Sequence, residues 1–125
     1  MDKRVKSYGV VTPEVLRSYD GLGFLKAIIE GTVPNPPISE LMGFHLTEVD
    51  KGRAVFEGVP EFHHYNPIGT VHGGFAATLL DSALGCAIFS TIEKGDAWTT
   101  LELLMRAAHE PGDGEADDDA AGDAQ

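Results

Sequence analysis

The chain has 125 residues, 42% of them apolar and 23% charged, which fits one soluble globular domain. The formal net charge is −11, but seven of the 20 acidic residues lie after residue 109, where no Lys or Arg occurs. Residues 1–109 carry 13 acids and nine bases without a basic cluster, which argues against nucleic-acid binding. The single cysteine, Cys86, excludes an internal disulfide and fits a reducing cytoplasm, where we expect the protein to reside.

The N-terminal region is predicted to be helical. Thr12-Pro13-Glu14 has the features of a helix start: a capping Thr, a Pro at the first helical position and an acid near the positive end of the helix dipole. Gly21 and Gly23 are expected to interrupt this helix. A helical pattern resumes at Phe24, and Gly31 is suited to end it.

A β-hairpin is predicted next, after an irregular connector over residues 32–37 and a short turn over residues 39–42. Phe44–Val49 and Arg53–Val59 are rich in β-branched and aromatic residues, and Asp50-Lys51-Gly52 separates them. Two such runs joined by a short loop that contains glycine are typical of an antiparallel pair.

A long apolar helix is predicted over Val71–Ile92, entered through His72-Gly73-Gly74. The only charged side chain between Phe62 and Ile92 is Asp81, and the helix is apolar on nearly every face, so the rest of the fold is expected to enclose it. Asp81 and the glycines disfavour a membrane span. A carboxylate on such a helix is costly to desolvate, which makes Asp81 a candidate general base or nucleophile.

Two segments with different residue patterns follow the helix. Ala97–Met105 alternates in polarity and is predicted to be a half-buried strand, whereas the acidic, glycine-containing residues 107–125 are predicted to be disordered. These patterns divide the chain into a helical segment with its connector (residues 1–40), an α+β domain (residues 41–106) and an acidic tail (residues 107–125).

Two segments carry a resemblance to a known family. They are Asn66-Pro67-Ile68-Gly69-Thr70-Val71-His72-Gly73-Gly74 and Thr78-Leu79-Leu80-Asp81-Ser82-Ala83-Leu84-Gly85, and they resemble the hotdog-fold acyl-CoA thioesterases, in particular the phenylacetate-degradation (PaaI-like) branch. The resemblance covers about residues 22–103. It implies a hotdog fold, in which a curved antiparallel sheet wraps a long central helix. The family's C-terminal strands are expected to be missing here, because the acidic tail stands in their place.

The resemblance also implies a function, the hydrolysis of small or aromatic acyl-CoA thioesters without a metal or another cofactor. The residues that match the family's catalytic positions are Asp81, Asn66, Gly73 and Thr100. Those that match its substrate-binding positions are His72, Gly74 and Thr99, and Thr99 is also the alternative to Thr100. Independently of the family, unpaired N–H groups at a helix start suit an oxyanion, and glycine lets a thioester oxygen approach them closely.

The spacing of these residues predicts a site shared between subunits. Gly73 and Asp81 are eight residues apart, which is about 12 Å along a helix, too far for both to act on one carbonyl. Asn66 and Gly73 of one subunit would therefore combine with Asp81 and Thr100 of another, in a homodimer or a dimer of dimers. Acyl-CoA is the expected ligand, and neither nucleic acid nor membrane is an expected partner.

Several simpler interpretations stay open. Asp81 could be an ordinary polar residue bonded to Thr78 or Ser82. His72 could have a purely structural role, which is to shape the turn. A metal site at His63 and His64 is not expected, because no third ligand has the usual spacing. The whole chain could bind acyl-CoA without hydrolysing it, or could be an inactive remnant of low stability, because the missing strands would leave large apolar side chains exposed.

Overall fold

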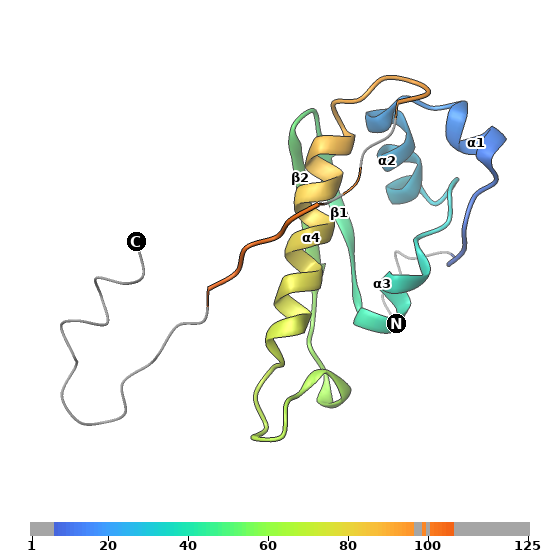
Figure 1. Ribbon diagram of the computed structural model, residues 1–125. Coiled ribbons are helices and arrows are strands. Elements are labelled where there is room, and N and C mark those ends of the chain that lie inside the picture. Colours follow the sequence, from blue (N-terminus) through green and yellow to red (C-terminus); the bar gives the residue numbers. More distant parts are fainter. Residues whose placement is uncertain (1–6, 97–98, 100, 107–125) are drawn as a thin grey trace.

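The computed structural model describes residues 7–96, 99 and 101–106. This part of the chain is α+β: a long helix packs across a two-stranded antiparallel sheet, and three short helices lie to one side (Figure 1). In chain order, the elements are α1 (Pro13–Arg17), α2 (Gly21–Glu30), α3 (Pro37–Met42), β1 (Phe44–Asp50), β2 (Arg53–Gly58), the 3₁₀ turn η1 (Phe62–His64) and α4 (Gly73–Phe89).

The predicted hairpin is confirmed, with each strand within one residue of its expected end. The register runs from Phe44 opposite Gly58 to Asp50 opposite Arg53, so the turn contains only two residues. Gly52 in this turn has φ of +76°, a conformation that residues with a Cβ rarely adopt.

The start of the second helix differs from the prediction. Thr12 caps α1 as expected, and Gly31 ends α2 with φ of 83°. However, Gly21 and Gly23 do not interrupt a helix; they form the first turn of α2. The sequence analysis missed the cap of this helix, Asp20, whose Oδ1 accepts the Gly23 N–H at 2.8 Å and so satisfies an amide of the first turn.

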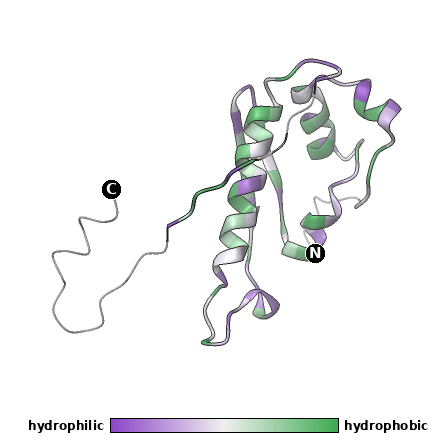
Figure 2. Cartoon of the chain, viewed as in Figure 1, coloured by the Kyte–Doolittle hydropathy of each residue, from purple (hydrophilic) through white to green (hydrophobic). Residues whose placement is uncertain are grey.

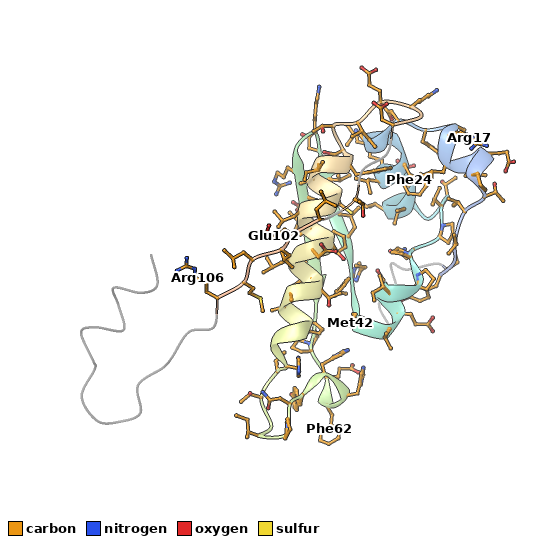
Figure 3. The ribbon with its side chains drawn as sticks, in the orientation of Figure 1. Arg17, Phe24, Met42, Phe62, Glu102 and Arg106 are labelled. Carbon is orange, nitrogen blue, oxygen red and sulfur yellow. The ribbon has the colours of Figure 1, made fainter. Side chains whose placement is uncertain are left out.

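One hydrophobic core joins the N-terminal helices to the hairpin. Its buried members are Leu25, Ala27, Ile28, Val33 and Leu46. Phe24 extends the packing toward α4, where its ring meets the edge of Phe89 with the ring centroids 5.8 Å apart (Figure 3). Residues 21–33 and the hairpin therefore pack as one unit.

The C-terminal end of α4 is fixed by three hydrogen bonds. The Ser90 hydroxyl donates to the Ala87 carbonyl at 2.6 Å and accepts the Gly52 N–H of the hairpin turn at 2.7 Å. In addition, the Gly21 N–H donates to the Ile92 carbonyl at 3.0 Å. These bonds tie the end of α4 to both the hairpin and the start of α2.

The long helix is shorter and more exposed than predicted. It begins at Gly73 and ends at Phe89, instead of spanning Val71–Ile92. Figure 2 shows α4 coloured mostly as hydrophobic. Its apolar stripe of Leu80, Leu84 and Ile88 is 46%, 55% and 49% exposed, so the described residues do not enclose the helix. Among the described elements, the hairpin and α2 make most of the contacts with α4, which leaves the face of Leu80, Leu84 and Ile88 largely uncovered.

The predicted strand over Ala97–Met105 is not found in its described residues. Thr99 and residues 101–106 belong to no strand and are exposed, and residues 101–106 cross α4 in Figure 1. A strand requires a neighbour for its backbone N–H and C=O groups, and the described part of the chain places none beside this segment. Residues 97, 98 and 100 and the tail predicted to be disordered lie outside the described residues.

Helix length and composition also bear on membrane insertion. Among the residues described, no helix is both long enough and apolar enough to cross a bilayer.

Candidate functional site

A cavity of about 540 Å³ lies between the N-terminal segments and α4, beside the contacts that join α2 to the end of α4. Most of its wall is apolar and aromatic, contributed by the segment before α1, by α2, by the prolines of the connector and by β2. The apolar side chains in this wall are Val10, Val11, Leu16, Phe24, Leu25, Ile28, Pro34, Pro36, Pro37, Phe56 and Phe89. Such a cavity suits a ligand with an apolar body.

Asp81 lies in the wall that α4 contributes, together with Ser82, Gly85 and Cys86. Asp81 is half-buried, and its carboxylate makes no hydrogen bond or ion pair with any other described residue. The Thr78 hydroxyl donates instead to the Gly74 carbonyl at 2.7 Å. The simple interpretation, an Asp81 satisfied by Thr78 or Ser82, therefore finds no support among these residues, and the carboxylate is available to a ligand.

Thr99 reaches the same cavity from the segment that follows α4. Of the two threonines that the sequence left open, Thr99 lines the cavity with Asp81, and Thr100 lies outside the described residues. The structure thus brings Asp81 and Thr99 to one cavity within a single chain.

The first turn of α4 holds the amides expected to bind an oxyanion. His72 is the N-cap, and its Nδ1 accepts the Gly74 N–H at 2.8 Å, while its carbonyl accepts the Phe75 N–H at 3.0 Å. The Gly73 N–H has no acceptor among the described residues, and Gly73 is exposed. Of the two glycine amides, that of Gly73 is therefore free for a ligand as far as the described residues go, because the imidazole of His72 occupies the Gly74 amide while it shapes the turn.

Asn66 builds the loop that leads into α4. Its Oδ1 accepts the N–H groups of Ile68 and Thr70, each at 3.1 Å, and its Nδ2 donates to the Thr70 hydroxyl at 2.7 Å. The side-chain oxygen is thus fully used within the loop, and one N–H of the amide is left for a ligand. The sequence signal for this role is the Asn-Pro-x-Gly turn, since Asn readily bonds the backbone two residues ahead.

The predicted site residues form two groups within one chain. Asn66, His72, Gly73 and Gly74 lie at the start of α4, and Asp81 and Thr99 lie by the cavity. A helix rises about 1.5 Å per residue, so about 12 Å separates Gly73 from Asp81. A single chain therefore does not bring the free amide and the free carboxylate to one carbonyl.

Sequence reasoning missed the structural role of His64. This histidine is only 8% exposed, and both of its ring nitrogens contact backbone groups, those of Glu61 and Leu41. A polar residue in an otherwise exposed loop gave no signal of burial. Among the described residues, no group of three or more His, Cys, Asp or Glu side chains is placed to hold a metal ion.

Cys86 provides a chemical test of the cavity wall. Burial raises the pKa of its thiol from 9.0 to about 11. At pH 8 we expect iodoacetamide to alkylate the native thiol roughly 100-fold more slowly than the unfolded chain, because two pKa units remove that much thiolate. Since the folded pKa is the higher one, the contribution of this thiol to the free energy of unfolding should be present below about pH 9 and be lost between about pH 9 and pH 11. Equal alkylation rates in buffer and in urea would contradict the described burial.

The whole chain was also compared with known proteins. No family model matches it, and no solved structure matches it. The site is therefore defined by its own geometry: an apolar cavity with a free carboxylate, and an exposed free amide at the start of the same helix.

Proposed function

We propose that the chain is a subunit of a hotdog-type thioesterase that hydrolyses small or aromatic acyl-CoA thioesters to the free acid and CoA. The observation that carries the proposal is the position of Asp81, whose carboxylate has no partner among the described residues and lies in the wall of an apolar cavity. The cavity would take the acyl group, and Asp81 would then stand beside the thioester carbon.

Asp81 can serve this reaction in two ways. As a general base, it takes a proton from water while the water oxygen bonds to the carbonyl carbon; the C–S bond then breaks, and the thiolate leaves and takes up a proton. As a nucleophile, it forms a mixed anhydride that water then hydrolyses. A single turnover in ¹⁸O-labelled water tests the second route: label in the Asp81 carboxylate means that Asp81 formed the anhydride and that water opened it at the Asp81 carbon.

The oxyanion donor would come from a second copy of the chain. Gly73 offers the free amide at the positive end of the α4 dipole, but it is about 12 Å from Asp81 of its own chain. A two-fold dimer or a dimer of dimers can place Gly73 of one subunit opposite Asp81 of its mate. The stripe of Leu80, Leu84 and Ile88 supports association, since burying the exposed half of each side chain would contribute about half of the roughly 1.5–3 kcal/mol of full burial.

Binding without hydrolysis is the second candidate function. The observation in its favour is that one chain forms the whole described cavity, whereas the two catalytic groups lie apart. A chain that cannot assemble the two-subunit site would still accept the acyl group. Two measurements separate the functions: calorimetric titration with non-hydrolysable acyl-CoA analogues, and thiol release from hydrolysable acyl-CoAs. Binding of the analogue together with no thiol release from any acyl-CoA indicates the second function.

Two substitutions at Gly73 test the thioesterase proposal. Gly73→Pro removes the N–H at the first helical position, where proline is well tolerated, and His72 already has the extended conformation that must precede a proline, with φ of −62° and ψ of 136°. We expect kcat for thiol release to decrease about 10²–10³-fold, the usual effect of losing an oxyanion donor. The assay measures thiol release from aryl, short-chain and long-chain acyl-CoAs.

Gly73→Ala is the matched control, because it keeps the N–H. A Cβ at this position would meet only the methyl carbon of Met105, at an ordinary 3.8 Å. Its turnover should therefore stay close to that of the wild type, with unchanged helix content by circular dichroism. Equal turnover in the Pro and Ala variants would show that the Gly73 amide does not act on the substrate.

A further inference from the structure

The buried imidazole of His64 has a defined protonation state in this structure. Its Nδ1 accepts the Glu61 N–H at 2.9 Å, and its Nε2 lies 3.2 Å from the Leu41 carbonyl oxygen, which can only accept. One ring nitrogen is thus an acceptor and the other a donor. This arrangement requires the neutral imidazole that carries its proton on Nε2.

The same residue supports the first turn of α4. Its backbone carbonyl accepts the His72 N–H at 2.8 Å, and its ring packs against Phe75 with the centroids 4.8 Å apart. An isolated bridge between Tyr65 and Val71 closes the loop between them. His64 therefore connects the end of α3, through Leu41, to the turn that presents the Gly73 amide.

We propose that His64 is a positioning residue, which holds the first turn of α4 in place only while its imidazole is neutral. Protonation converts Nδ1 into a donor that faces the Glu61 N–H, so the bond to Glu61 is lost and two donors oppose each other. Acidification should therefore release the turn, and with it the amide on which the proposed function depends.

The surrounding charges do not replace this bond. The titratable groups that share the two cavities beside His64 come from the N-terminal segment, α3, both strands, η1 with its cap, and the residues before α4: Tyr8, Glu40, His45, Glu57, Glu61, His63, Tyr65 and His72. The Glu61 carboxylate accepts the backbone N–H of His64, and among the described residues no carboxylate bonds a ring nitrogen of His64. The His63 ring lies 4.0 Å away between centroids, and its Nδ1 is 3.9 Å from the Glu61 carboxylate.

Hydrogen–deuterium exchange of the full-length protein tests this role without a substrate. After correction for the intrinsic pH dependence, we expect the hydrogen-bonded amides of His72, Gly74 and Phe75 to lose about tenfold in protection between pH 7.5 and pH 5.0, while those of the hairpin, residues 44–58, keep theirs. Unchanged protection of these three amides at the two pH values would overturn the proposal.

Three variants assign the effect to one histidine. His72→Asn is the background for all of them, because the Nδ1 of His72 accepts the Gly74 N–H and its protonation would act on the same amides, whereas asparagine is an efficient N-cap whose oxygen does not titrate. In this background, adding His64→Asn should remove the pH dependence, whereas adding the neighbouring His63→Gln should keep it. A pH effect that persists with His64→Asn, or that disappears with His63→Gln, would contradict the assignment.

A measurement on the wild type covers the case in which His64→Asn does not fold. Long-range ¹H–¹⁵N correlation spectra at pH 7.5 should show His64 with its proton on Nε2, and a proton on Nδ1 would overturn the proposal. Neither experiment uses turnover, so the two proposals can fail separately. A loss of amide protection at pH 5.0 in a protein that releases no thiol would contradict the proposed thioesterase function and still support the positioning role of His64.

Discussion

Asp81→Asn is expected to lower the rate of thiol release by about 10³-fold, the middle of the range for loss of a general base. Asparagine has nearly the same shape as aspartate and fills the same part of the cavity wall, but it can neither take a proton from water nor attack the thioester. Affinity for a non-hydrolysable acyl-CoA analogue should therefore change little. The measurement is kcat for the best substrate of the panel, with Kd by calorimetry.

A mixing experiment makes this prediction specific to a shared site. Asp81→Asn and Gly73→Pro subunits, each nearly inactive alone, are unfolded together and refolded. With random pairing, half of the dimers are mixed and each holds one intact site of two, so we expect about one quarter of the wild-type activity to return. Each variant refolded alone is the control. A mixture that stays inactive while mixed dimers form would show that Gly73 and Asp81 do not act across the interface.

Gly21→Ala is expected to destabilise the fold by about 3 kcal/mol, a large part of the stability of a typical small domain. A Cβ on Gly21 would overlap the Phe89 carbonyl oxygen, which belongs to the last turn of α4. This neighbour is backbone and cannot rotate away. Separating the two helices would also break the bond from the Gly21 N–H to the Ile92 carbonyl. The measurement is the urea midpoint followed by circular dichroism.

Gly9→Ala provides the comparison for this substitution. Its added Cβ would meet the Pro34 ring at an ordinary 3.6 Å, and its N–H would still donate to the Asn35 carbonyl. The urea midpoint of this variant should therefore equal that of the wild type. A Gly21→Ala midpoint that is also unchanged would mean that α2 and α4 do not approach each other as closely as described.

The sequence alone determined the features that depend on neighbouring residues. The Thr12 cap, the Gly31 helix end and the hairpin around Gly52 were predicted correctly, because capping and tight turns depend on a few adjacent side chains and on positive φ. The candidate residues Asp81 and Gly73 were also found from sequence, as the only charge on an apolar helix and the first residue of that helix. The helical spacing alone gave the distance between them.

Only the tertiary structure decided which of these groups have partners. Gly21 starts a helix instead of interrupting one, because Asp20 caps it and α4 leaves no room for a side chain there. The polarity pattern of Ala97–Met105 predicted a strand, but its described residues have no neighbouring strand to pair with. His64 binds backbone groups 23 and 3 residues away, and the Asp81 carboxylate faces a cavity formed mainly by the N-terminal helices and connector. The Asp20 cap and the bond between His64 and Glu61 are local and were missed, whereas the contacts with Leu41, α4 and the cavity join residues distant in sequence, so no local pattern could have predicted them.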